Sequence, residues 1–204
     1  SKFYTEKIIY LPNCYQPQND EINVSSEIPS KKELGLPENY FVFCAINNTY
    51  KITPQIFDIW MKILNKVEKS VIWLLENNES SKNNLIREAN IRGVNREKLV
   101  FAKRTSHEKY LSQFKYADLF LDTFIYGAGA TASNALWMGV PLLTMTGNSY
   151  SARMATSLLH SVGLEELITS SNKDYEDLAL QLSTDEKQLK AIKEKLIGNL
   201  SNKP

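Results

Sequence analysis

Short, almost wholly apolar runs alternate with segments whose apolar residues recur at helical spacing, and this alternation constrains the fold more than any other feature. The run at 41–46 is apolar throughout, as expected of a strand buried on both faces of a sheet. Behind it, Pro54 follows Thr53 and opens a segment with apolar residues at helical spacing. Four further apolar runs predict strands at 71–75, 99–101, 119–121 and 141–144.

Helices are expected between and after these strands. Besides the helix that begins at Pro54, they cover 82–91, 106–115, 131–138, 151–162, 173–182 and 185–197. No hairpin turn separates the strands, so the order indicates βα repeats and a parallel sheet, with right-handed crossovers that place helices on both faces. The sequence therefore predicts a doubly wound α/β fold, in which ligands bind beyond the carboxyl ends of the strands.

The length of 204 residues suits one domain. Residues 1–36 are rich in Asn, Pro, Gln and Ser, and we expect a lead-in segment whose short helix at 31–36 packs on the domain. The domain itself is expected to fill 37–204. Because the chain does not start with Met and shows no signal peptide, we expect it to be part of a longer protein.

Charge and cysteine content narrow the function classes. The formal charge is 24 − 23 = +1, which gives no global attraction to nucleic acid or to an anionic membrane. No apolar run approaches the roughly 20 residues that a membrane-spanning helix needs. Two cysteines, without a CxxC motif or a His cluster, predict neither a disulfide framework nor a metal site, and Cys44 is expected in the core. The expected setting is reducing and cytoplasmic.

Three loops that follow strands carry polar residues or glycines at the edge where a ligand is expected. Asn48 and Lys51 follow the first strand, the third strand leads to His107 and Tyr110, and the loop at 122–131 contains Gly127 and Gly129. That last loop runs into a helix, whose free N–H groups and positive dipole end suit a diphosphate. A tight strand-to-helix turn explains the glycines equally well.

Each of the other residues also has a plainer explanation. Taken singly, Lys51 is more often a solvated lysine, Tyr110 a cover for the sheet, and His107 a polar surface residue. The residues alone therefore predict a phosphate-containing ligand at this edge of the sheet, and nothing more specific.

A wider set of stretches, in the same order along the chain, is similar to a known family. These stretches are 10–12, 36–47, 50–51, 117–118, 121–123, 135–141, 151–153, 164–168 and 174–177. Together they resemble the carboxy-terminal catalytic region of the O-GlcNAc transferase family, which includes bacterial TPR-containing relatives and the SPINDLY proteins.

The resemblance implies a GT-B glycosyltransferase, in which two Rossmann-like domains face each other and the second holds most of the donor nucleotide. This chain would be that carboxy-terminal half. Its implied partners are a nucleotide-sugar donor, a protein or peptide acceptor, a preceding Rossmann-like domain and TPR repeats.

The resemblance also implies roles for individual residues. Lys51 matches the lysine that neutralises the donor diphosphate and stabilises the departing nucleotide. Tyr110 matches a residue that stacks on uracil, and His107 stands where a lysine lies beside the nucleoside. Asn48 stands in place of a glutamine beside the phosphates.

The remaining positions lie in the glycine-containing loop at 122–131 and in the helix that follows it. Ala130 and Thr131 replace a Thr-Thr pair after Gly129, so one hydroxyl is lost at the start of the helix. Asn134 replaces a carboxylate that accepts hydrogen bonds from the ribose hydroxyls. A hydrogen bond to a neutral amide there is weaker than a charge-assisted one.

The implied reaction is an inverting transfer of a sugar to a Ser or Thr hydroxyl of a protein. UDP-GlcNAc is the first candidate donor, with UDP-glucose and GDP-fucose as alternatives. The resemblance implies a reaction without a metal, and no Asp-x-Asp motif occurs, so no metal or other cofactor is expected. No residue stands out as a general base. The alternative function is a nonenzymatic nucleotide-binding or protein-interaction module that has lost catalysis. The changes at Asn48, Ala130 and Asn134 favour this alternative, and the retained Lys51 and Tyr110 oppose it.

Overall fold

The computed structural model describes residues 5–12, 14–16, 19 and 21–201 of the chain. Its centre is a six-stranded sheet in the order β3-β2-β1-β4-β5-β6, and every neighbouring pair is parallel. The strands are β1 Phe41–Ala45, β2 Ser70–Leu75, β3 Leu99–Ala102, β4 Leu119–Leu121, β5 Leu142–Met145 and β6 Ile168–Thr169. The strand order reverses between β1 and β4, so the switch point of the doubly wound fold lies there.

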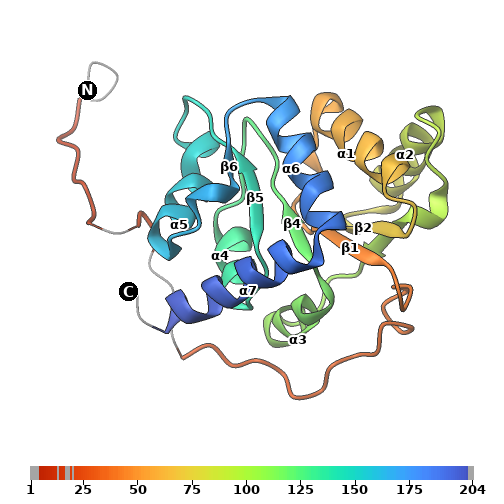
Figure 1. Cartoon of the computed structure of the whole chain (residues 1–204), viewed down its shortest axis with the longest axis horizontal. Helices are drawn as coiled ribbons and strands as arrows, with labels where there is room; N and C mark the ends of the chain where they lie inside the picture. The colour runs from red at the N-terminus through yellow and green to blue at the C-terminus, as the bar shows by residue number, and fades with distance from the viewer. Residues whose placement is uncertain (1–4, 13, 17–18, 20, 202–204) are drawn as a thin grey trace.

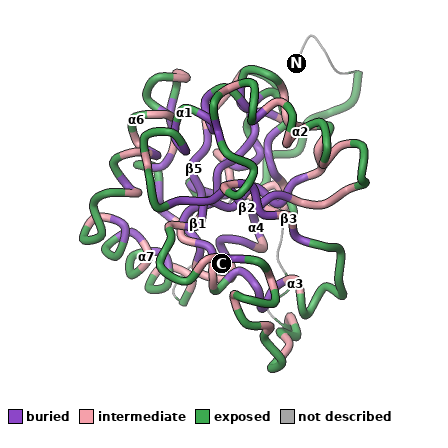
Figure 2. Tube along the Cα trace, turned by 90° about the vertical axis from the view of Figure 1, so that its right-hand side faces the viewer, coloured by how far each residue is buried: buried purple, intermediate pink, exposed green. Residues whose placement is uncertain are grey.

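Seven α-helices of the described residues surround this sheet. They are α1 Pro54–Lys66, α2 Glu79–Ile91, α3 His107–Gln113, α4 Ala130–Trp137, α5 Met154–Val162, α6 Asn172–Thr184 and α7 Glu186–Leu200. Figure 2 shows the buried strands in the centre with helices on both sides of them. Helix α6 packs between α1 and α7 (Figure 1). The predicted doubly wound α/β fold is confirmed.

Several helices begin where a polar side chain caps them. The hydroxyl of Thr53 accepts a hydrogen bond from the Ile56 N–H at 3.4 Å, and Pro54 fills the first helical position of α1. Asn78 accepts from the Ser81 N–H at 2.8 Å, so α2 begins three residues before the predicted start.

The core joins the sheet to α1 and α6. Cys44 is fully buried, as predicted. The buried indole of Trp60 donates to the hydroxyl of Tyr175, which in turn donates to the backbone carbonyl of Asp122 at 2.9 Å. This chain of contacts fixes the end of β4 against two helices on one face.

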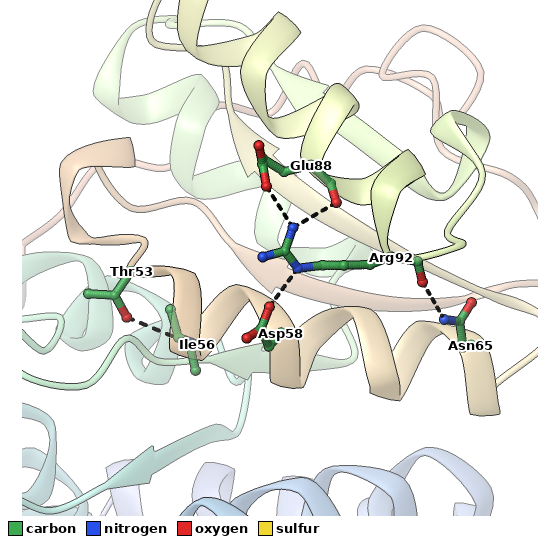
Figure 3. Close-up of polar contacts among 6 residues, drawn as sticks. All are labelled: Thr53, Ile56, Asp58, Asn65, Glu88 and Arg92. Carbon is green, nitrogen blue, oxygen red and sulfur yellow. Dashed lines mark hydrogen bonds and ion pairs between the residues drawn. The ribbon is translucent and has the colours of Figure 1, made fainter.

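A second cluster fastens the carboxyl end of α2 to α1. The guanidinium of Arg92 donates to Asp58 on α1 at 2.6 Å, and to the carboxylate of Glu88 at 2.7 Å and its carbonyl at 2.9 Å (Figure 3). Asn65 donates to the carbonyl of Arg92 at 3.1 Å. Two carboxylates therefore neutralise this arginine in a structural role.

Two elements differ from the prediction. Residues 31–35 form turns and not a helix, because Gly35 adopts a left-handed φ of 71° and Pro37 follows it within a stretch too short to sustain helical hydrogen bonding. Strand β6 was not predicted, since two residues leave no recognisable apolar run. Residues 151–153 form a 3₁₀ turn, and α5 proper begins at Met154.

The segment before β1 follows the surface of the domain and passes α3 on its way to the sheet (Figure 1). Ser25 N–H donates to the carbonyl of Glu108, and the hydroxyl of Tyr116 donates to the carbonyl of Pro29 at 2.9 Å. Among the described residues, no helix is both long and apolar enough to cross a membrane.

Candidate functional site

A pocket of about 400 Å³ opens at the carboxyl ends of β1, β2 and β3, against the amino end of α4. Its floor includes Ile46, Leu75 and Ala102, the residues at or just beyond the ends of the three strands. Of the residues predicted from sequence, it brings together Asn48, His107, Tyr110, Ala130, Thr131 and Asn134. The pocket lies at the edge where the fold predicts a ligand.

Tyr110 lies within the pocket wall as a half-buried aromatic ring. Its ring meets Phe114 edge-on at 5.0 Å between centroids and lies 6.2 Å from His107 at an interplanar angle of 29°. Burial raises the pKa of the Tyr110 hydroxyl, while hydrogen bonds with Asn134 and Thr131 act in the opposite direction. Tyr110 therefore presents a neutral phenol and an aromatic ring to the pocket.

Asn134 and His107 close the side of the pocket next to α3 and α4. The Asn134 amide nitrogen is 3.5 Å from Nε2 of His107, whose donor or acceptor role depends on the tautomer. Because neither an amide nor an imidazole carries negative charge, this pair lacks the negative charge that a carboxylate at position 134 would bring.

The loop between β4 and α4 is organised by Asp122, which is fully buried. Its Oδ1 accepts from the N–H groups of Thr123 at 2.8 Å and Ala128 at 2.7 Å, and its Oδ2 accepts from the Thr144 hydroxyl at 2.7 Å. Burial raises the pKa of Asp122 to about 6, and these hydrogen bonds with the charge of Lys51 partly oppose the rise. The carboxyl group thus determines the path of the loop that enters α4.

Close packing inside the protein surrounds the two glycines of this loop. A Cβ on Gly127 would lie 3.0 Å from the Ser151 carbonyl and 3.1 Å from Oδ2 of Asp122. A Cβ on Gly129 would lie 2.9 Å from the Tyr15 hydroxyl. Close backbone packing therefore accounts for Gly127, whereas Gly129 is close only to side chains, and Gly129 is not part of the pocket lining.

Lys51 also lies outside the pocket lining, on the 3₁₀ turn Thr49–Lys51. Its ammonium donates to the carbonyl of Gly127 at 2.9 Å and lies 4.3 Å from the ring centroid of Tyr126. Burial lowers the pKa of Lys51, and the charge of Asp122 opposes that shift. The lysine is thus bound to the β4–α4 loop, next to the pocket, through one of the three N–H donors of its ammonium.

The loop carrying that carbonyl contains an unfavourable backbone conformation. Ile125 has a φ of 77°, in the left-handed region that a β-branched side chain rarely adopts. The Ser151 hydroxyl donates to the Ile125 carbonyl at 3.0 Å, and the Thr123 hydroxyl donates to the Tyr126 carbonyl at 2.8 Å. These contacts hold the strained loop in place.

Sequence reasoning missed three residues at the site. Arg104 lines the pocket and donates through Nη2 to Asn77 at 2.8 Å and to Asn48 at 3.3 Å. Asn77 follows β2, so the same rule that selected the other strand-end loops would have found it. Gln113 lines the pocket with a side chain from α3, and helical spacing from Tyr110 was its only signal.

No group of three or more His, Cys, Asp or Glu side chains within the described ranges could hold a metal ion. The polar groups that face the pocket are amides, hydroxyls and cations. Such groups suit an uncharged or anionic organic ligand.

Comparison with curated proteins identifies long relatives of which this chain matches a part. It is 30% identical over 199 residues to the probable UDP-N-acetylglucosamine–peptide N-acetylglucosaminyltransferase SEC of Arabidopsis thaliana, across 95% of this chain and 20% of the relative. It is 33% identical over 177 residues to the corresponding enzyme of Caenorhabditis elegans, across 87% of this chain and 15% of the relative. The chain therefore spans a fifth or less of these two relatives.

Solved structures agree. A mutant O-GlcNAc transferase of Thermobaculum terrenum superposes with a TM-score of 0.77 at 30% identity, covering 88% of this chain and 34% of that one. The carboxy-terminal domain of a Francisella tularensis group 1 glycosyltransferase has a TM-score of 0.64 at 11% identity, which supports the Rossmann-like fold alone. The predicted Rossmann-like architecture, of the kind found in the carboxy-terminal half of GT-B enzymes, is confirmed.

The predicted resemblance to O-GlcNAc transferases and SPINDLY proteins is confirmed as well. The sequence model described as glycosyl transferase family 41 matches residues 3–203, nearly the whole chain. The chain belongs to glycosyl transferase family 41.

Proposed function

We propose that this chain is the donor-binding domain of an inverting glycosyltransferase. The enzyme moves GlcNAc from UDP-GlcNAc to Ser or Thr hydroxyls of proteins. The observation that carries the proposal is the pocket at the ends of β1–β3, lined by residues to which the resemblance gives donor-binding roles, in a chain whose relatives are named as UDP-GlcNAc–peptide transferases.

The start of α4 is the proposed binding site for the diphosphate. Ala130 and Thr131 line the pocket there, and α4 begins with N–H groups that have no partner inside the helix. The positive end of the helix dipole favours an anion at this place. The Thr131 hydroxyl supplies a further donor.

Tyr110 is the proposed platform for the base, and His107 and Asn134 are proposed to contact the ribose. The aromatic ring offers stacking at a half-buried position, which favours a planar ligand. Asn134 can accept from or donate to a ribose hydroxyl, as can a neutral His107.

Lys51 is the proposed catalytic residue. Negative charge grows on the leaving diphosphate as the bond to the sugar breaks, and a fixed cation there stabilises the transition state more than the ground state. Its ammonium is half-buried beside the loop that enters α4 and spends one of its three N–H donors on the Gly127 carbonyl, which leaves donors for a phosphate oxygen. The mechanism needs no metal and takes its acceptor from outside this chain.

Calorimetric titration of the chain with UDP, GDP and uridine tests the proposal. We expect UDP to bind more tightly than GDP, because Tyr110 stands where the resemblance implies stacking on uracil. We also expect UDP to bind more tightly than uridine, because the proposed diphosphate site is the start of α4. If the chain binds no nucleoside diphosphate, the proposed function is wrong.

The nonenzymatic alternative makes a different prediction for a longer protein that contains this chain. A glycosyltransferase should slowly hydrolyse UDP-GlcNAc without an acceptor, whereas a binding module should hold the nucleotide and leave it intact. Release of free GlcNAc, followed over time against a Lys51→Ala control, distinguishes the two.

A further inference from the structure

Arg104 lies where three strand-end loops meet. It follows β3, its Nη2 donates to Asn48 after β1 at 3.3 Å, and the same nitrogen donates to Asn77 after β2 at 2.8 Å. Asn77 is itself held, because its amide nitrogen donates to the hydroxyl of Thr49 at 3.1 Å. Neutral amides therefore fix the guanidinium at the wall of the pocket.

The remaining donors of this guanidinium are not used by the protein. A guanidinium has five N–H groups, and both hydrogen bonds of Arg104 start from Nη2. Within the described residues, Nε and Nη1 find no acceptor and no carboxylate forms an ion pair with Arg104. These donors lie in a residue that lines the pocket.

Arg92 of the same chain shows the opposite arrangement. Asp58 and Glu88 pair with its guanidinium at 2.6 and 2.7 Å, so its charge is neutralised and its role is to join two helices. Arg104 is held in one orientation by neutral groups only, so its full charge remains available.

The charge of the residues that line the pocket also favours an anionic ligand. The cations Lys103 and Arg104 line it, and no Asp or Glu does. A guanidinium binds phosphate through two parallel N–H···O bonds, and orientation before binding lowers the entropic cost of that contact. An oriented, unpaired guanidinium in a pocket without carboxylates fits a phosphate group.

We infer that Arg104 binds the diphosphate of the donor from the β1–β3 side of the pocket, opposite the start of α4. The inference rests on the proposed function and names a further binding residue for it. Asn48 and Asn77 orient the guanidinium. Because Asn48 gives its carbonyl oxygen to Arg104, its amide N–H groups are directed elsewhere and can also donate to a phosphate.

The test compares UDP, UMP and uridine binding by calorimetry in the 204-residue chain and in Arg104→Gln. The glutamine keeps a polar side chain and removes the charge. We expect roughly tenfold weaker UDP binding, a smaller loss for UMP and no change for uridine. The salt dependence of UDP binding should also decrease, because one cation fewer meets the phosphates.

Arg87→Gln is the matched control. Arg87 lies on α2, is exposed and makes only a 3.7 Å ion pair with Glu88, so the variant removes the same charge away from the pocket. Its affinities should equal those of the unaltered chain. Asn77→Ala keeps Arg104 and removes one restraint, and should weaken UDP binding by about twofold to fivefold without affecting uridine. If Arg104→Gln does not fold, the Asn77→Ala variant tests the role of Arg104 by itself.

The outcomes separate the two proposals. UDP affinity that is unchanged in Arg104→Gln, or an equal loss for UDP and uridine, overturns the role of Arg104 and leaves the proposed function standing. If the unaltered chain binds uridine and UDP equally well, the diphosphate contact is wrong for every residue assigned to it. Absence of any nucleotide binding overturns the proposed function itself.

Discussion

Lys51 holds the β4–α4 loop in the structure and is also the proposed contact for the ligand. In the structure its ammonium satisfies the Gly127 carbonyl and lies over the ring of Tyr126. The remaining N–H donors of this ammonium are proposed to contact the departing diphosphate. In a longer active protein that contains this chain, we expect Lys51→Ala to remove a charge-assisted contact worth about 1.5–3 kcal/mol, which lowers kcat roughly 10- to 100-fold.

Steady-state kinetics with a single donor check this expectation. Lys51→Arg should restore little activity, because a planar fork replaces a compact ammonium. Tyr110→Ala should behave differently and mainly raise KM, since stacking contributes to the ground state and the transition state alike. Unchanged kcat and kcat/KM in Lys51→Ala would remove Lys51 from the mechanism and favour the nonenzymatic alternative.

Asp122 should make the stability of the folded domain depend on pH, and the direction of its pKa shift sets the sign of that dependence. Burial raises the pKa of this carboxyl from 3.8 to about 6 in the folded state. The folded protein therefore holds the proton at pH values where the unfolded chain has lost it. The stability from this group is fully present below about pH 4 and is lost as the pH rises through about 6.

Asp122→Asn removes the titration and isolates the effect. The free energy of unfolding of the unaltered chain, minus that of the variant, should fall by on the order of 2 kcal/mol between pH 4 and pH 7. Urea unfolding at several pH values measures it. A difference that stays constant, or increases with pH, would show that Asp122 is ionised throughout and that its three hydrogen bonds outweigh the burial.

The site shows what can be predicted at the scale of single residues. Strand-end position and family pattern identified Tyr110, Thr131 and Asn134, and the structure brings them together in one pocket. They did not identify Arg104, because its contacts to Asn48 and Asn77 join loops that are far apart in sequence. Its role depends on which acceptors surround it, and that is a property of the folded chain.

At the scale of elements, burial on both faces made the sheet predictable. The apolar runs identified β1 to β5 within one or two residues, because parallel strands covered by helices must be apolar along their length. The two-residue strand β6 carries too little sequence to show that pattern. The predicted helix at 31–36 failed for a related reason, since one turn cannot offset the cost of nucleating a helix.

The junction of α1 and α2 offers a prediction at the same scale. Arg92→Ala removes the contacts to Asp58 and to the Glu88 side chain (Figure 3). Because all three side chains are partly exposed, solvent screening limits the loss to about 1 kcal/mol, or a Tm lower by about 2–4 °C.

Arg87→Ala serves as the control on the same helix, and its exposed 3.7 Å pair should leave Tm nearly unchanged. Differential scanning fluorimetry compares the two variants. Equal Tm values for both would mean that packing of α1 and α2 on the sheet holds the junction without Arg92.

At the scale of the whole molecule, the site lies at one edge of the sheet. The pocket, Lys51 and the exposed rings of Tyr50 and Tyr126 all lie at the ends of the strands, where this chain provides no covering domain among its described residues. The matched bacterial enzyme is about three times as long as the part that superposes here, since the match covers 34% of it. We therefore expect this chain to keep donor binding and to lack sugar transfer.

We expect the 204-residue chain to bind UDP and to transfer no sugar. Binding needs the pocket and the start of α4, which the chain contains, whereas transfer needs an acceptor held within bonding distance of the sugar. The measurement is radiolabelled GlcNAc incorporated into a Ser- and Thr-containing peptide, with UDP binding verified on the same preparation. Robust transfer by this chain would show that it positions an acceptor by itself. Binding without transfer would assign acceptor positioning to residues outside it.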